Sequence, residues 1–324
     1  MISLPDYVHI KENGKDRTLQ LSVFLQTHEI TFDDDEKYRN ALEKIKELAK
    51  GNILPSQALS QEDTQFYEYL LENHLAYESQ VQDPAISEQG CSGVAFYNRL
   101  YNLVNNQWAL ERGETTLAQA MLEPEKYRIL LLGWTLEYFH VTRLAVSSLV
   151  GILADQLPAA LQTLAQEFVK EELFHERIMA KAFNDTPWRE EQLYASTPLP
   201  STLAYMDLLK DMALRRPHSF FASLFFYEGD DDDLMEFSER IPDTPEFHKI
   251  RDSHLSHARI NVQGEHADFT KRYFELIPLL SNQQQQEIID DMAYLNFLYY
   301  DLQDEIVACY QHENDLESRL CANQ

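Results

Sequence analysis

The sequence predicts a mainly α protein, in which a helical bundle follows a small α+β domain at the N-terminus. Glycine is scarce, with only 9 residues among 324, whereas about 23 would be expected at roughly 7% usage. Folds that depend on tight turns and phosphate-binding loops need more glycine than this. From residue 90 onward, apolar side chains also recur at the three- and four-residue spacing of amphipathic helices.

The first strands are indicated by two β-prone runs around a turn signal. Tyr7–Ile10 and Thr18–Phe24 flank Asn13 and Gly14, and an Asn-Gly pair between apolar runs is a strong hairpin signal. Glu29–Phe32 is a candidate third strand. We therefore expect a small sheet at the start of the chain.

Two helices and a return strand complete the N-terminal domain. Asp34–Lys50 has apolar residues at helical spacing and acidic residues at its positive end. A second helix is expected from about Ser60 to Asn73, followed by a strand at Leu75–Tyr77. This order of elements predicts a winged-helix-like domain over residues 1–83.

The rest of the chain, residues 90–320, is expected to form the bundle. Prolines lie in the loops between long apolar-periodic segments, and Pro124 and Pro158 suit the first turn of a helix. Long helices in series predict a bundle whose interior can hold a ligand or metals. The expected helices are Gly93–Glu111, Glu125–Leu153, Pro158–Phe183, Ser201–Arg215, Glu246–Leu276 and Asn282–His312.

Composition argues against several classes of partner and compartment. The formal net charge is −27, and residues 1–83 carry 8 basic against 16 acidic side chains, so we expect neither a nucleic-acid partner nor an anionic membrane surface. No G-x-G-x-x-G or G-K-[ST] string occurs, which argues against a dinucleotide or P-loop enzyme. The cysteines are scattered, the N-terminus lacks a signal-peptide-like apolar stretch, and no segment is expected to span a membrane. We expect a cytoplasmic protein.

A carboxylate and an imidazole occur at metal-ligand spacing in the third expected helix. Glu172 and His175 form a Glu-x-x-His pair, the spacing by which bundle proteins supply one carboxylate and one imidazole to a metal. The same spacing also arises by chance. Oxygen and nitrogen donors without sulfur favour iron or manganese over structural zinc.

Further candidate ligands lie downstream at intervals that suit successive bundle helices. Glu228 ends an aromatic run 53 residues after His175, and His257 follows 29 residues later. The alternatives are a solvated acidic loop for Glu228 and a surface position for the downstream histidines. The candidate metal ligands are thus Glu172, His175, Glu228, His257, Asn261, Glu265 and His266.

These positions resemble the motif of the haem-oxygenase-like diiron oxidases, a branch of the fold shared with thiaminases and the pyrroloquinoline quinone synthase. Members carry Glu and His on one helix, Glu on the next core helix and His-x3-Asp-x2-His on a third. Glu172 with His175 matches the first part, and Glu228 matches the second. On the third helix His257 matches, whereas Asn261 replaces the family's aspartate.

The third helix leaves the ligand register open. The final family histidine is displaced by two positions, to His266, and a second register aligns Arg259 and Gln263 with the family ligands, which leaves too few for two irons. Because the amide of Asn261 removes a negative charge and a strong oxygen donor, we expect a weak second iron site.

A second Glu-x-x-His pair, Glu137 and His140, lies in the second expected helix beside Trp134 and Tyr138. The resemblance implies that aromatic residues of this kind surround a substrate cavity. We therefore expect these residues, together with His254, around the metal ligands or in the cavity wall. For His140, a satisfied core histidine is an equal alternative.

The resemblance implies a non-haem iron oxidoreductase that uses Fe(II) and O₂, with two irons expected. Its substrate would be an amine, an amino acid, or an amino acid held on a peptide or carrier, and the reaction would be N-oxygenation, C–C cleavage or desaturation in a natural-product pathway. An electron donor is also implied. The alternatives are a metal-free helical binding or scaffold protein, and a cofactor-free oxidase of the quinone-synthase branch.

The N-terminal domain also loosely resembles peptide-clamp domains, in which a leader peptide adds a strand to the hairpin. The alternatives are a plain structural appendage and a dimerisation domain, which leaves a homodimer open.

Overall fold

The computed structural model describes residues 2–50, 61–78, 90–123, 126–154, 157–184, 186–227, 231–245, 247–264 and 268–321. The chain divides into two compact units, and each is described by itself. Unit 1 comprises residues 1–113 and 274–286, and unit 2 comprises residues 114–273 and 287–324. The domain boundary that the sequence predicts between residues 83 and 90 stays a prediction.

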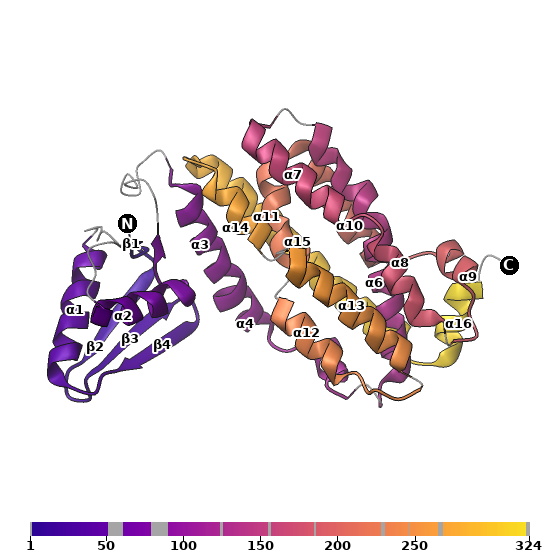
Figure 1. Cartoon of the computed structure of the whole chain (residues 1–324), viewed down its shortest axis with the longest axis horizontal. Helices are drawn as coiled ribbons and strands as arrows, with labels where there is room; N and C mark the ends of the chain where they lie inside the picture. Colours follow the sequence, from indigo (N-terminus) through magenta and orange to yellow (C-terminus); the bar gives the residue numbers. More distant parts are fainter. Residues whose placement is uncertain are drawn as a thin grey trace. The chain divides into compact units, whose positions relative to one another are not determined.

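Unit 1 contains the small sheet that the sequence predicts. Strands β2 (Val8–Asn13), β3 (Thr18–Val23) and β4 (Gln26–Thr31) form an antiparallel meander with β3 in the centre (Figure 1). Alternate residues of β3 are fully buried against the helices of the unit, as expected for a strand with one face on a core. The short strands β1 (Ile2–Ser3) and β5 (Tyr77–Glu78) pair separately.

Two helices supply the other half of this core, α1 (Asp35–Ala49) and α2 (Gln61–Glu72). The Asp34 carboxylate accepts a hydrogen bond from the backbone N–H of Lys37 and so caps α1. Tyr38, Ile45 and Leu48 of α1 are buried, and Leu42 is partly buried against the same core.

Unit 1 also takes in the next helical stretch and a return segment. α3 (Gly93–Leu103) continues through a π-helical turn, Val104–Trp108, into α4 (Ala109–Arg112). Gly90 allows the backbone to meet Leu280, because a Cβ at this position would lie 1.9 Å from the Leu280 carbonyl oxygen and φ is +139°.

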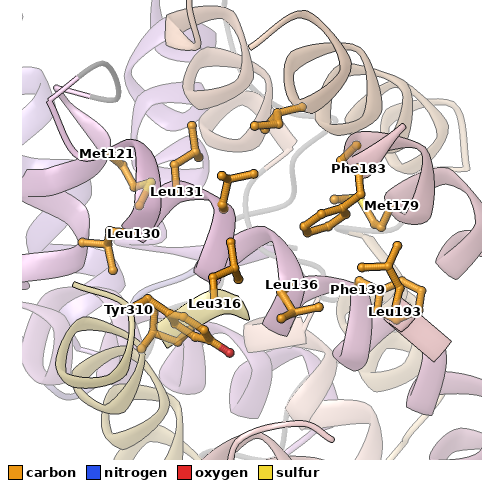
Figure 2. Packing of buried hydrophobic residues seen from close by; sticks show 14 of the residues in the cluster. Met121, Leu130, Leu131, Leu136, Phe139, Met179, Phe183, Leu193, Tyr310 and Leu316 are labelled. Carbon is orange, nitrogen blue, oxygen red and sulfur yellow. The ribbon is translucent and has the colours of Figure 1, made fainter. Parts of the chain in front are cut away.

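In the described residues of unit 2, all the regular secondary structure is helical. Its centre is α6 (Arg128–Leu149), which packs against α8 (His175–Ala180), α10 (Pro200–Arg215) and α16 (Glu313–Cys321). Helix α13 (His248–Gly264) packs against α8 and against α12 (Asp231–Arg240). Figure 2 shows part of the apolar core around α6. The other helices are α5 (Thr116–Met121), α7 (Ala159–Glu171), α9 (Glu190–Ala195), α11 (Pro217–Tyr227), α14 (Phe269–Glu275) and α15 (Asn282–Cys309), with α14 and α15 crossing the division between units.

Two of the long helices expected from the sequence are divided in the structure. Pro158–Phe183 is not one helix, because the chain turns at Glu172–Phe174 between α7 and α8. Glu246–Leu276 contains both α13 and α14. The aromatic run before Glu228, which was not among the expected helices, forms α11.

Among the described residues, one stretch is long and apolar enough by composition to cross a membrane, namely Arg128–Ala154. Half of its most apolar window is buried inside the structure, and the core helix of a soluble protein meets the same criterion. Because the stretch buries Glu137 and His140 against other helices, we interpret it as a core helix.

Candidate functional site

Glu172 and His175 meet at the break between two helices. α7 ends at Glu171, and α8 begins at His175. Phe174, between them, has a φ of 74°, in the left-handed region that is uncommon for a bulky residue and costs about 1–3 kcal/mol. Glu172 Oε2 lies 3.4 Å from His175 Nδ1, and both side chains are buried. The turn therefore brings the two groups into direct contact.

Helix α13 places His257 against this pair. The rings of His175 and His257 have centroids 4.8 Å apart and are inclined at 78°. On its other side, His257 Nδ1 lies 3.2 Å from the hydroxyl oxygen of Tyr138 on α6. When Nδ1 carries the proton and donates to Tyr138, Nε2 keeps its lone pair, which is the arrangement usual for a histidine that binds metal.

Asn261 follows His257 at the i+4 position of α13, on the same helical face, and is also buried. The structure thus places four of the predicted ligands in the interior of unit 2. They come from the α7–α8 break and from α13: Glu172, His175, His257 and Asn261.

The other three predicted ligands, Glu228, Glu265 and His266, lie outside the described residues. Within the described part of the chain, no group of three or more His, Cys, Asp or Glu side chains could hold a metal ion. The ligand register and the number of metals therefore stay predictions. The donor chemistry of Glu172, His175 and His257, one carboxylate and two imidazoles without a thiolate, fits ferrous iron.

Aromatic rings surround His254, one turn before His257. The imidazole lies parallel to the ring of Trp134, with centroids 4.6 Å apart, and to the ring of Tyr138, at 5.6 Å. Phe237 of α12 meets both Trp134 and His254 edge-on. Burial lowers the pKa of His254 to about 3, because an imidazolium ion would lose its hydration in this setting.

The second Glu-x-x-His pair, Glu137 and His140, lies in a different environment. Glu137 accepts hydrogen bonds from the hydroxyl groups of Thr202 and Tyr310, each at 2.5 Å, and from the backbone N–H of Leu199 at 3.0 Å. Arg319 Nη2 lies 4.0 Å away. Burial raises the pKa of Glu137, and the hydrogen bonds act in the opposite direction.

His140 is fully buried and contacts a different partner, the hydroxyl group of Ser196, at 3.0 Å from Nε2. Burial, assisted by the positive charges of Arg143 and Arg319, lowers its pKa to about 3. The structure therefore brings Glu137 and His140 into contact with core partners, and Trp134, Tyr138 and His254 into contact with one another.

Sequence reasoning missed three groups that shape these sites. Thr135 lies 3.1 Å from His254 Nε2 through its hydroxyl oxygen, and Tyr310 and Thr202 hold Glu137. The sequence carries a weak signal for Thr135, because it is a hydroxyl residue in an apolar helix, three positions before Tyr138. The sequence carries no signal for Tyr310, because its partner Glu137 lies 173 residues away.

The comparisons with known proteins support the fold. No protein-family model matches the chain, and no curated protein matches it. Among solved structures, the chain is similar to a domain of unknown function with a heme oxygenase-like fold from Shewanella denitrificans OS217. The match has a TM-score of 0.53 and 18% sequence identity, and it covers 66% of this chain and 93% of that domain. The chain therefore has a haem oxygenase-like helical fold with a small N-terminal sheet, as the sequence predicts.

Proposed function

We propose that this chain is an Fe(II)- and O₂-dependent oxidase or oxygenase, with Glu172, His175 and His257 among the iron ligands. One observation carries the proposal: in the interior of a haem oxygenase-like bundle, His175 contacts both the carboxylate of Glu172 and the imidazole of His257. Bound iron would supply the reaction with O₂ and the electron transfer. Glu228, Asn261, Glu265 and His266 are the candidates for the remaining ligands.

The side chains around these groups have definable tasks. Tyr138 holds the ring of His257 through Nδ1, and the burial of all three donors, each at most 4% exposed, keeps bulk water away. We propose an amine, an amino acid, or an amino acid on a peptide or carrier as the substrate, with an external electron donor where O₂ is reduced further than the substrate allows.

Iron binding provides the direct test. The protein is loaded with Fe(II) without oxygen, desalted and analysed for iron, as wild type, Glu172→Gln and His257→Ala. Each substitution has a matched control: Glu167→Gln on α7, the helix that precedes Glu172, where Glu167 is an exposed partner of Arg272, and His248→Ala on α13, where His248 is exposed.

The proposal expects the two ligand variants to lose iron and the two controls to retain it at the wild-type level. O₂ consumption by the loaded protein should fall with the iron. Equal iron in all five proteins would contradict the proposal. The absence of iron from the wild type would instead favour a metal-free binding protein or a cofactor-free oxidase, for which the amide of Asn261 is the best support.

A leader peptide or carrier at the N-terminal sheet is part of the same proposal. In the described residues the strand order is β2-β3-β4, so an added strand would pair with β2 or β4, the outer strands. Thr18–Phe24, the second run of the expected hairpin, corresponds to the central strand. Hydrogen exchange with a candidate peptide should protect amides of β2 or β4; if no peptide protects either strand, this part of the proposal is wrong.

A further inference from the structure

The proton positions at His254 can be deduced from its hydrogen bonds. His254 is fully buried, its Nε2 lies 3.1 Å from Thr135 Oγ1, and its Nδ1 is buried with no hydrogen-bond partner among the described residues. Thr135 has a single hydroxyl proton, which it donates to the carbonyl oxygen of Leu131 at 2.8 Å. Thr135 Oγ1 can therefore only accept from His254, and Nε2 carries the proton.

The charge of His254 follows from the same contacts. An imidazolium ion would place a second N–H at Nδ1, buried where no described residue accepts it, and such a group is costly. The low pKa that burial imposes on His254 agrees with a neutral ring. Nδ1 is thus a buried acceptor, and only an N–H or O–H donor could pair with it.

Tyr138 contacts both His254 and His257. The Tyr138 ring is parallel to His254 within 9° and to Trp134 within 6°, and its hydroxyl oxygen lies 3.2 Å from His257 Nδ1. Packing against these two parallel rings restricts the ring of Tyr138 and so the position of its hydroxyl group. The contacts therefore run from Thr135 through His254 and Tyr138 to His257.

We propose that His254 is a positioning residue, locked by Thr135 as the neutral Nε2–H tautomer, and that it orients Tyr138 and thereby His257. The tautomer of His254 is a property of the metal-free protein and does not depend on the proposed function. Its consequence for metal binding rests on the proposed function. The two histidines, one helical turn apart, then have opposite tautomers: His254 carries its proton on Nε2, and His257, as a metal ligand through Nε2, carries its proton on Nδ1.

Nitrogen NMR of metal-free protein labelled with ¹⁵N-histidine tests this at pH 7, because protonated and unprotonated ring nitrogens resonate far apart. His254→Gln and His257→Gln identify the two sets of signals. We expect the Nε2–H pattern for His254. An imidazolium or an Nδ1–H tautomer at His254 would overturn the inference, whereas an Nε2–H tautomer at His257 would count against the proposed metal ligand and leave the His254 result unchanged.

Substitutions test whether the orientation of His254 affects His257 through Tyr138. Thr135→Val should abolish the pure Nε2–H pattern of His254 and shift the signals of His257, and Thr135→Ser should restore both. Tyr138→Phe keeps the ring but removes the hydroxyl group, so it should shift His257 and spare His254. Thr142→Val is the matched control, because the buried Thr142 hydroxyl also donates to a backbone carbonyl of α6, that of Phe139.

A second readout separates positioning from structural support. Loss of an outer hydrogen-bond partner of a metal ligand costs about 10–100-fold in metal affinity, so Tyr138→Phe, which removes the partner of His257, should weaken Fe(II) binding by at least about tenfold. Thr135→Val should weaken it in the same direction, and Thr142→Val should leave it unchanged. If the signals of His254 and His257 do not change in folded Thr135→Val protein, the proposal that His254 orients His257 is wrong.

Discussion

The two Glu-x-x-His pairs of this chain have the same spacing and opposite environments. Glu137 and His140 lie on the continuous helix α6, and each contacts separate partners, hydroxyl and N–H donors for the carboxylate and Ser196 for the imidazole. Glu172 and His175 lie across the α7–α8 break and contact each other at 3.4 Å. The identical spacing therefore gives a structural element in one place and a candidate metal site in the other.

The difference shows that the partners of a motif, and not its spacing, decide its chemistry. The carboxylate of Glu137 receives three hydrogen bonds inside the core, which suits a fixed structural role. At the other pair, the chain turns through the left-handed residue Phe174, and His175 contacts both the Glu172 carboxylate and the His257 ring.

The largest effect is expected from Glu137→Leu. It leaves the donors of Thr202, Tyr310 and Leu199 without their buried acceptor, and breaking a buried charged network typically costs about 3–5 kcal/mol. Urea unfolding should show this loss in the free energy of unfolding. The folded fraction should still bind iron as the wild type does; a parallel loss of iron would mean that the two pairs form one site.

Tyr310→Phe should cost less, about 1.5–3 kcal/mol, the usual worth of a hydrogen bond to a charged group. Gly133→Ala probes the same contact, because its Cβ would lie 2.1 Å from the Tyr310 ring and displace it. Both variants should lower the midpoint of urea unfolding. Stability equal to the wild type in both would show that Tyr310 does not hold Glu137.

The low pKa of His140 predicts acid sensitivity. An imidazole with a pKa near 3 when folded and about 6.5 when unfolded contributes its full stability above pH 6.5 and loses it as the pH falls towards 3. At pH 5 the loss amounts to about 2 kcal/mol, at 1.36 kcal/mol per pH unit.

Urea unfolding at pH 7.5 and pH 5 measures that loss. His140→Gln should reduce the difference between the two pH values by about 2 kcal/mol. His312→Gln, at an exposed histidine of the same unit, serves as control and should leave the difference unchanged. A difference that is identical in all three proteins would contradict a neutral, buried His140.

The smallest effect is expected at the metal site itself, from Asn261→Asp. It restores the carboxylate that the family resemblance places here, and a negatively charged oxygen donor should raise Fe(II) affinity by on the order of tenfold. Competition with a chelator measures the change. Weaker binding in the variant would show that Asn261 does not face the metal.

The fold was largely predictable from the sequence. The apolar period located the long helices, and the Asn-Gly turn located the first hairpin, because both signals are local. The break at Glu172–Phe174 was not predictable, because Phe174 adopts a left-handed conformation in which sequence rules expect glycine or asparagine.

The candidate site was predictable in part. Glu172, His175 and His257 could be selected because helical spacing and donor chemistry are visible in the sequence. The role of Tyr138 as a partner of His257, and the bonds of Glu137 to Tyr310 and Thr202, depend on contacts between residues far apart in the chain. No spacing rule records such contacts.

The most direct test of the central claim replaces the histidine of each Glu-x-x-His pair by alanine in separate variants. His175→Ala and His140→Ala are loaded anaerobically with Fe(II), and the iron bound per folded chain is compared with the wild type. The account predicts that His175→Ala loses the iron and that His140→Ala retains it. Iron retained by His175→Ala, or lost from folded His140→Ala, would contradict the assignment of the metal site to the α7–α8 break.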